Sequence, residues 1–114
     1  MAKVLASTVG IDRRTWLELR KNGLGGSDAP AVVGLSPWKS PVAVWLEKTG
    51  QAEPEEPGEA AYWGTVLEDV VAREFSLRTG LKTRRRNAIL QHPKYEWMIA
   101  NVDRFIVGEN IGLE

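Results

Sequence analysis

The hydrophobic pattern of the chain changes its period once, close to Gly80. Before this glycine, apolar residues recur at the three- and four-residue spacings that are typical of helices. After it, apolar and polar residues alternate with the period of two that is typical of strands. Several helices followed by consecutive strands predict an α+β fold rather than a βαβ repeat.

The helical part is divided by residues that start and stop helices. Three segments each begin after a residue that commonly caps a helix and end at a glycine. The pairs of cap and glycine are Asp12 and Gly23, Ser27 and Gly34, and Ser40 and Gly50. We expect short helices within these three segments and one long helix over 59–79, which Gly80 ends. We interpret 1–12 as a flexible leader and the acidic, proline-rich stretch 51–59 as a loop.

The strand part contains three segments, 81–92, 97–107 and 111–114. Because they follow one another closely, we expect the antiparallel, three-stranded start of a mixed sheet. A sheet that stops within its third strand leaves one edge unpaired. The sequence therefore predicts that 1–114 is the N-terminal portion of a single domain that is incomplete at its C-terminus.

Composition excludes several classes of function. The chain has 114 residues, a formal net charge of zero and no cysteine. The lack of cysteine excludes disulfides, thiolate metal sites and thiol nucleophiles. The neutral charge means that nucleic-acid binding would need a local basic patch. Neither a signal peptide nor a membrane-spanning run is present in the sequence, so we expect a cytoplasmic protein that makes no membrane contact.

Two carboxylates lie on segments that are predicted to be neighbouring strands. Alternation along 97–107 puts Asp103 on the same face as Ile99 and Phe105. With an even-numbered turn, Glu114 falls on that face about one diagonal from Asp103, roughly 7–8 Å or less, whereas a slip of one residue separates them. Two converging charges would favour a proton, a basic partner or a divalent cation. A solvated glutamate at the chain end is the alternative.

A third acid comes from the long helix. Glu68 shares a helix face with Val71 and Phe75 and therefore borders the apolar stripe. Gly64, one turn earlier, costs helix stability but would let a neighbouring backbone come close. A glutamate at the rim of an ordinary amphipathic helix is the alternative interpretation.

Basic residues occur in two places that could bind phosphate. Arg20 precedes Ser27 by seven residues, and Ser27 stands at a predicted helix N-terminus, where backbone amides and a hydroxyl favour anions. A helix cap beside a flexible turn is the alternative. The run Arg84, Arg85 and Arg86 could follow a phosphate backbone or be a solvated strand edge.

Four segments, taken in their order along the chain, resemble one family over about residues 13 to 114. They are "GLGGSDAPAVVGLSPWKSPVAVWLEKTG", "WGTVLEDVVAREFSLRTGL", "HPKYEWMIANVDRF" and "GLE". The family is the YqaJ-like viral recombinases, which are related to lambda exonuclease and belong to the PD-(D/E)xK nucleases. The resemblance implies a restriction-endonuclease-like fold, a central mixed sheet flanked by helices. It also implies DNA phosphodiester hydrolysis with Mg²⁺ or Mn²⁺, in many members as a 5′→3′ exonuclease of phage-type recombination.

The resemblance also implies roles for individual residues. Asp103 matches the aspartate metal ligand, Glu114 the glutamate of a Glu-x-Lys element, and Glu68 the helix acid that supports the metal site. Arg20 and Ser27 match the positions that hold the 5′ phosphate in the exonuclease branch. The implied partners are double-stranded DNA with 5′-phosphate ends, a single-strand annealing protein and, as in ring-forming relatives, further copies of the chain. The implied compartment is the cytoplasm of a bacterial host, with a bacterial or phage gene.

One element of the family pattern has no counterpart here. The lysine two positions after the glutamate is missing because the sequence ends at Glu114. We therefore expect the family's activity to describe a parent protein, and this chain to hold a partial metal site with little activity. A non-catalytic DNA-end or partner-binding module, and a structural or assembly domain, are the competing hypotheses.

Overall fold

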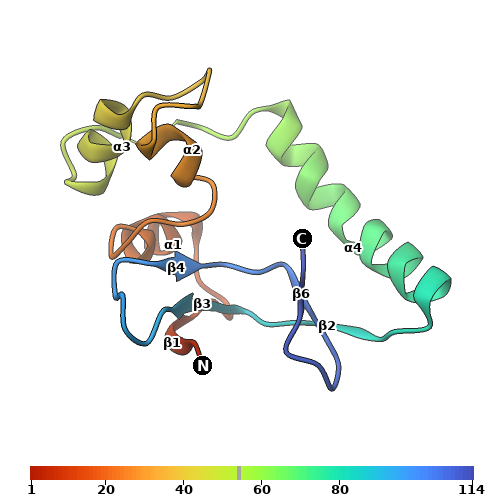
Figure 1. The fold of residues 1–114 in the computed structure, drawn as a ribbon. Helices are drawn as coiled ribbons and strands as arrows, with labels where there is room; N and C mark the ends of the chain where they lie inside the picture. The colour runs from red at the N-terminus through yellow and green to blue at the C-terminus, as the bar shows by residue number, and fades with distance from the viewer. Residues whose placement is uncertain (54) are drawn as a thin grey trace. The chain divides into compact units, whose positions relative to one another are not determined.

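The computed structural model of the chain describes residues 1–53 and 55–114, which form two compact units. One unit consists of the chain before residue 55 together with Asn87–Asn101, and the other of Glu55–Arg86 together with Val102–Glu114. Each unit has its own helices and its own three-stranded antiparallel sheet (Figure 1). The expected α+β class is therefore confirmed.

The sheet of the first unit has the order β1-β3-β4, with β1 at Lys3–Ser7, β3 at Ala88–Gln91 and β4 at Ile99–Ala100. The central strand is the most buried of the three, and its Ile89 is completely buried. Ala31 and Val44 from the helices complete the core of this unit. The first three residues of β3 are all buried although successive side chains point to opposite faces, which explains the continuous "AIL" run of this strand.

Three short helices belong to the first unit: α1 at Arg13–Arg20, α2 at Ala29–Val32 and α3 at Pro41–Lys48. Two predicted caps are confirmed. Asp12 accepts a hydrogen bond from the Thr15 amide at 2.8 Å, and Ser40 accepts one from the Ala43 amide at 3.1 Å.

The predicted cap at Ser27 is wrong. Asp28 occupies the N-cap position of α2, and its side chain makes no capping hydrogen bond there. Its carboxylate accepts instead from the Gly25 amide at 2.9 Å, which closes the preceding turn. Since α2 has four residues, its dipole is small, and the helix-terminal anion site predicted at Ser27 loses this support.

The second unit places one long helix beside a sheet of order β2-β5-β6. Its elements are α4 at Glu59–Thr79, β2 at Thr83–Arg85, β5 at Arg104–Ile106 and β6 at Gly112–Leu113. The predicted bounds of the long helix are confirmed, with Gly80 at φ 73° as its left-handed C-cap. Among its described residues only Ala72 is fully buried, while Leu67 and Val71 are about half exposed.

The predicted antiparallel three-stranded sheet is present as β2-β5-β6, but both long strand segments are broken, and their other halves belong to the sheet of the first unit. Segment 81–92 becomes β2 and β3, which belong to different sheets, and Asn87 between them has φ 45°. A residue in the left-handed region interrupts an extended strand, and Asn tolerates it better than most residues. Segment 97–107 is likewise divided into β4 and β5 by residues 101–103.

The predicted flexible leader is also corrected, since Lys3–Ser7 forms strand β1 and pairs with β3. In the predicted loop 51–59, residue 54 lies outside the described residues, and the described remainder has no helix or strand before Glu59. Among the described residues, no helix combines the length and apolar character that crossing a membrane requires.

Candidate functional site

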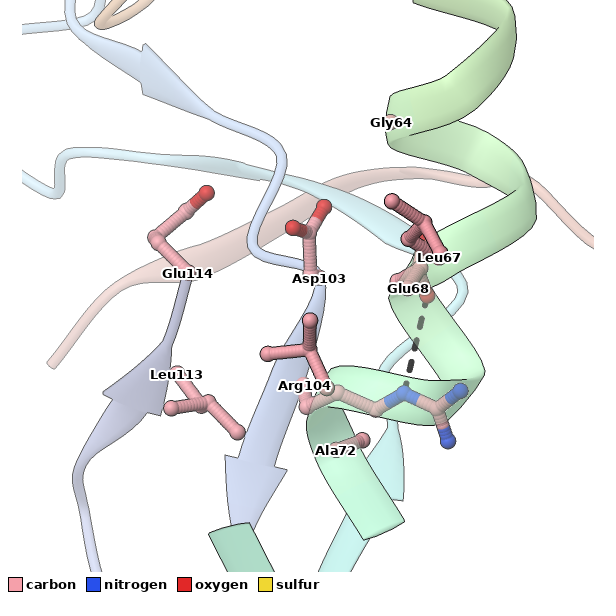
Figure 2. A pocket seen from close by; sticks show the side chains of 9 residues that line it. Gly64, Leu67, Glu68, Ala72, Asp103, Arg104, Leu113 and Glu114 are labelled. Atoms are coloured by element: carbon pink, nitrogen blue, oxygen red, sulfur yellow. Dashed lines mark ion pairs between the residues drawn. The ribbon is translucent and has the colours of Figure 1, made fainter. Parts of the chain in front are cut away.

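Three acidic side chains line one pocket of the second unit. The cavity measures about 280 Å³ and is bounded by α4 and by the strands β5 and β6. Figure 2 shows Asp103 just before β5 and Glu114 just after β6, at the adjoining ends of these strands, with Glu68 projecting from the helix. The lining residues are Gly64, Leu67, Glu68, Val71, Ala72, Asp103, Arg104, Leu113 and Glu114.

The strand register brings Asp103 and Glu114 opposite one another. Arg104 pairs with Leu113 in the β5–β6 ladder, so the next positions outward are Asp103 and Glu114. The turn between the strands is closed by a hydrogen bond from the Ile106 amide to the Ile111 carbonyl at 3.0 Å, which leaves the even number of residues 107–110 in the loop. The predicted shared face is therefore correct, and the two acids are direct rather than diagonal neighbours.

The electrostatics of the pocket act mainly on Glu114. Partial burial, the charge of Asp103 and the charge of Glu68 together raise the pKa of the Glu114 carboxyl above its usual value. Each of these causes disfavours the ionised form. The pocket therefore carries an excess of negative charge that a proton or a cation would relieve.

Glu68 is partly neutralised by a neighbour that the sequence did not single out. Arg104 Nε lies 3.5 Å from Glu68 Oε1, and the Arg104 side chain is only 13% exposed (Figure 2). The same Nε is buried without a hydrogen-bond partner among the described residues, so its contact with Glu68 is electrostatic only. The guanidinium of Arg104 thus faces Glu68 on the helix and points away from Asp103 and Glu114.

The predicted basic run is divided by the fold. Arg85 donates to Asp69 Oδ1 at 2.7 Å, and Arg104 donates to the same oxygen. These two contacts lower the pKa of Asp69 and bind α4 to β2 and β5. Arg84 is exposed and Arg86 is half-buried. Arg85 therefore serves an ion pair within the unit, and DNA binding by the run stays a prediction.

The residues of the pocket fit a divalent cation in part. Mg²⁺ is commonly held by one or two carboxylates together with water and substrate phosphate. Asp103 and Glu114 supply two such carboxylates, and their mutual repulsion is the property a cation would relieve. Within the described residues, however, no group of three or more acidic or histidine side chains forms a ready metal site. Glu68 would have to leave Arg104 to become a third ligand.

Gly64, at the helix side of this pocket, does not meet a neighbouring backbone. An added Cβ would find no atom within 4 Å. The interpretation of this glycine as a point of close approach is therefore wrong for the described structure, and the glycine instead leaves the space beside Glu68 open.

The first unit brings Arg20 and Ser27 into contact. Arg20 Nη2 donates to Ser27 Oγ at 3.0 Å, and its guanidinium carbon lies 4.8 Å from the centre of the Trp16 ring. The cation–π contact and the hydrogen bond hold the guanidinium in place. The two residues expected to bind phosphate are thus neighbours, and their role stays a prediction.

Two further charged residues meet at this point. Asp28 is 7% exposed, and its Oδ2 lies 3.1 Å from Lys48 Nζ and 3.8 Å from Arg20 Nη2. Burial would raise the pKa of Asp28, but the Gly25 amide and the two cations outweigh it and lower the pKa. Sequence reasoning missed Lys48 because it lies 28 residues from Arg20, and only the packing of α3 brings the two together.

Comparison with known proteins agrees with the resemblance seen in the motifs. Residues 15–114 match the family described as YqaJ-like viral recombinase domain. A Bacillus subtilis (strain 168) protein with the name "Uncharacterized protein YqaJ" is 53% identical over 114 residues. The match covers 99% of this chain and 36% of that relative, so the chain spans about 36% of the relative's length. The chain belongs to the YqaJ-like viral recombinase family.

Proposed function

We propose that this chain contributes the acidic metal pocket and the DNA-end site of a recombination nuclease. The reaction is metal-dependent hydrolysis of DNA phosphodiesters, carried out as a 5′→3′ exonuclease on duplex ends. Because the chain spans only part of its relative, the activity is proposed for a protein that contains the whole family region.

The observation that carries the proposal is the pairing of Asp103 and Glu114. If the two acids served only a structural salt bridge, a basic side chain would lie beside them, but Arg104 faces Glu68 and Asp69 instead. Partial burial and the charges of Asp103 and Glu68 raise the pKa of Glu114, and this is a cost to folding at neutral pH. Sites that tolerate such a cost are often functional ones.

The residues divide the work as follows. Asp103 and Glu114 would hold the cation, which supplies Lewis-acid polarisation of the phosphate and a more acidic water. Glu68 would orient that water or complete the ligand set once released from Arg104. Arg20 and Ser27 would receive the terminal phosphate through charge-assisted hydrogen bonds, which favours ends over internal sites.

The test uses a chimera in which this chain replaces the matched region of the Bacillus relative, alongside the 114-residue chain itself. Linear duplex DNA with 5′-phosphate ends is incubated with Mg²⁺ or with EDTA, and each strand is labelled to read polarity. We expect Mg²⁺-dependent release of nucleotides from the 5′ end by the chimera. Glu68→Gln, Asp103→Asn and Glu114→Gln should each abolish it.

The matched control is Glu74→Gln, because Glu74 is an exposed acid on the same helix that pairs with Arg78 outside the pocket. This variant should retain activity. Degradation that persists in EDTA, or full activity in Asp103→Asn, would overturn the nuclease proposal.

A second function has one observation in its favour. The pocket lacks a ready three-ligand group among the described residues, whereas Arg20 and Ser27 are already in contact. A DNA-end-binding module without chemistry would keep the preference for phosphorylated ends and show no Mg²⁺-dependent degradation in the chimera. The same assay, run with a binding measurement, distinguishes the two.

A further inference from the structure

Two cations from two different helices meet at one buried carboxylate in the first unit. Arg20 is the last residue of α1, Lys48 is the last residue of α3, and Asp28 lies between them. The side chains are 21%, 18% and 10% exposed, respectively. This burial is unusual for charged residues, which are fully buried only when they are paired.

Lys48 is fixed by two acceptors. Its Nζ donates to the Arg20 carbonyl oxygen at 2.8 Å and lies 3.1 Å from Asp28 Oδ2. The same carbonyl accepts from the Gly23 amide at 3.4 Å, and it lies at the end of α1, where a cation is also favoured by the helix dipole. An ammonium has three N–H donors, and nothing in the described part of the chain takes the third.

Arg20 is fixed in a comparable way. Ser27 takes one donor of its guanidinium, whose central carbon lies over the Trp16 ring. Because both Arg20 Nη2 and Lys48 Nζ lie close to the same Asp28 oxygen, one small anion can reach both. Donors on both cations remain for it.

The charges of the cluster do not cancel. Two cations face one carboxylate, so an excess of about one positive charge is held in a partly buried setting, where an unmatched charge is costly. A phosphate monoester carries about −1.5 to −2 charges at pH 7 and three acceptor oxygens. A terminal phosphate is therefore attracted more strongly by this positive site than an internal phosphodiester, which carries a single charge.

We propose that Lys48 is a second phosphate-binding residue of the DNA-end site, and that Asp28 is the positioning residue that holds Lys48 and Arg20 at one point. This inference rests on the proposed function, because it takes the ligand to be the 5′-phosphate of a DNA end. It adds a cation from α3 to the Arg20–Ser27 pair. An ion cluster that only stabilises the packing of α1 against α3 is the competing account.

The test measures binding in EDTA, so that catalysis does not enter. Fluorescence anisotropy with the chain and with the chimera gives the affinities for a duplex with a 5′-phosphate end and for the same duplex with a 5′-hydroxyl end. The wild type should prefer the phosphate. Lys48→Met should reduce this preference by about tenfold, the value of one hydrogen bond between charged groups. Lys48→Arg, which keeps the charge, should restore much of the preference.

The matched control is Lys39→Met, because Lys39 pairs with Glu47 at 2.8 Å in the same unit and takes no part in the cluster. Its preference should equal that of the wild type. A preference that is unchanged in Lys48→Met, or reduced equally in Lys39→Met, would overturn the role of Lys48. Thermal unfolding of every variant identifies any that fail to fold, and Lys48→Gln, which removes the charge but keeps a donor for the Arg20 carbonyl, then carries the test with the same expected loss of preference.

Asp28→Asn tests the positioning role by the sign of its effect. The substitution keeps an acceptor for Gly25 and raises the positive charge of the site by one. If Asp28 positions the cations, the phosphate preference falls although the charge rises. Tighter binding of both duplexes with an unchanged preference would make Asp28 a counter-ion only.

The outcomes also separate this inference from the proposed function. If the wild type does not prefer phosphorylated ends, the proposed phosphate site is wrong, and the proposed role of Lys48 is wrong with it. If the wild type has the preference and Lys48→Met keeps it, only the proposed role of Lys48 is wrong. Loss of Mg²⁺-dependent degradation with the preference intact would leave Lys48 in place and overturn only the chemistry.

Discussion

Glu114 faces Asp103 across the β5–β6 ladder, one position beyond the paired Arg104 and Leu113. Opposite charges at such cross-strand positions stabilise a sheet, and like charges destabilise it. The basic side chain within reach, Arg104, is engaged by Glu68 and Asp69 on α4. The fold thus keeps two carboxylates together and directs the Arg104 guanidinium to two other acids.

The raised pKa of Glu114 predicts that its ionised form costs stability. The pKa of the Glu114 carboxyl is higher in the folded than in the unfolded chain. The contribution of this carboxyl to folding stability is therefore complete below the unfolded pKa, and it is lost as the pH rises through the folded pKa. Glu114→Gln should therefore raise the free energy of unfolding at pH 7 by roughly a few tenths of a kcal/mol, as expected for an exposed charge. The gain should vanish below the usual glutamate value of 4.5.

Urea denaturation at pH 7 and at pH 4 measures this effect. Glu109→Gln is the control, because Glu109 is an exposed acid in the turn of the same hairpin. A Glu114→Gln variant that is less stable than the wild type at pH 7 would contradict the proposed repulsion.

Arg104 should weaken cation binding by occupying Glu68. Replacing it with Gln removes a positive charge beside the pocket and frees the helix acid. We expect Arg104→Gln to raise the affinity for Mn²⁺ by roughly two- to fivefold, since a unit charge in this setting is worth on the order of 1 kcal/mol. Isothermal titration calorimetry measures the change.

The control for Arg104 is Arg85→Gln, which removes the other guanidinium from Asp69 without touching Glu68. Its Mn²⁺ affinity should stay closer to that of the wild type. Equal gains in the two variants would show a general charge effect, and weaker binding in Arg104→Gln would show that Arg104 supports the site.

Gly23 should be indispensable for the packing of the first unit. An added Cβ would lie 2.5 Å from the Trp97 carbonyl oxygen and 3.0 Å from Ile99 Cγ2. Gly23→Ala would push Leu24 away from Trp97, whose backbone groups are hydrogen-bonded to each other. We expect it to lower the free energy of unfolding by about 1–3 kcal/mol. Gly26→Ala is the matched control, because its Cβ would meet nothing within 4 Å, and it should change stability by less than about 0.5 kcal/mol. Equal stability of the two variants in urea would contradict this packing.

The parts of the fold that sequence reasoning predicted are local. The cap at Asp12 and the left-handed stop at Gly80 depend on residues within one turn, so their chemistry is visible in the sequence. The Asp103–Glu114 pairing was accessible for the same reason, since the parity of a short turn fixes the register.

The parts that were missed depend on distant partners. Strand β1 forms because Lys3–Ser7 pairs with β3, more than 80 residues later in the chain, and the short mixed sequence gives no sign of this. The break at Asn87 divides what alternation alone presents as one strand. Lys48 reaches Asp28 only through the packing of α3, and Arg104 reaches Glu68 only through the placement of α4 beside β5.

The most direct test of the account is a Mn²⁺ titration of the 114-residue chain and the chimera, followed by calorimetry. If Asp103 and Glu114 hold the cation, the wild type should show one saturable site, and Asp103→Asn and Glu114→Gln should each lose affinity by about tenfold or more. Glu109→Gln should bind as the wild type does. The absence of saturable Mn²⁺ binding in the chimera, or binding that is unchanged in Asp103→Asn, would contradict the claim that this acidic pair is a metal site.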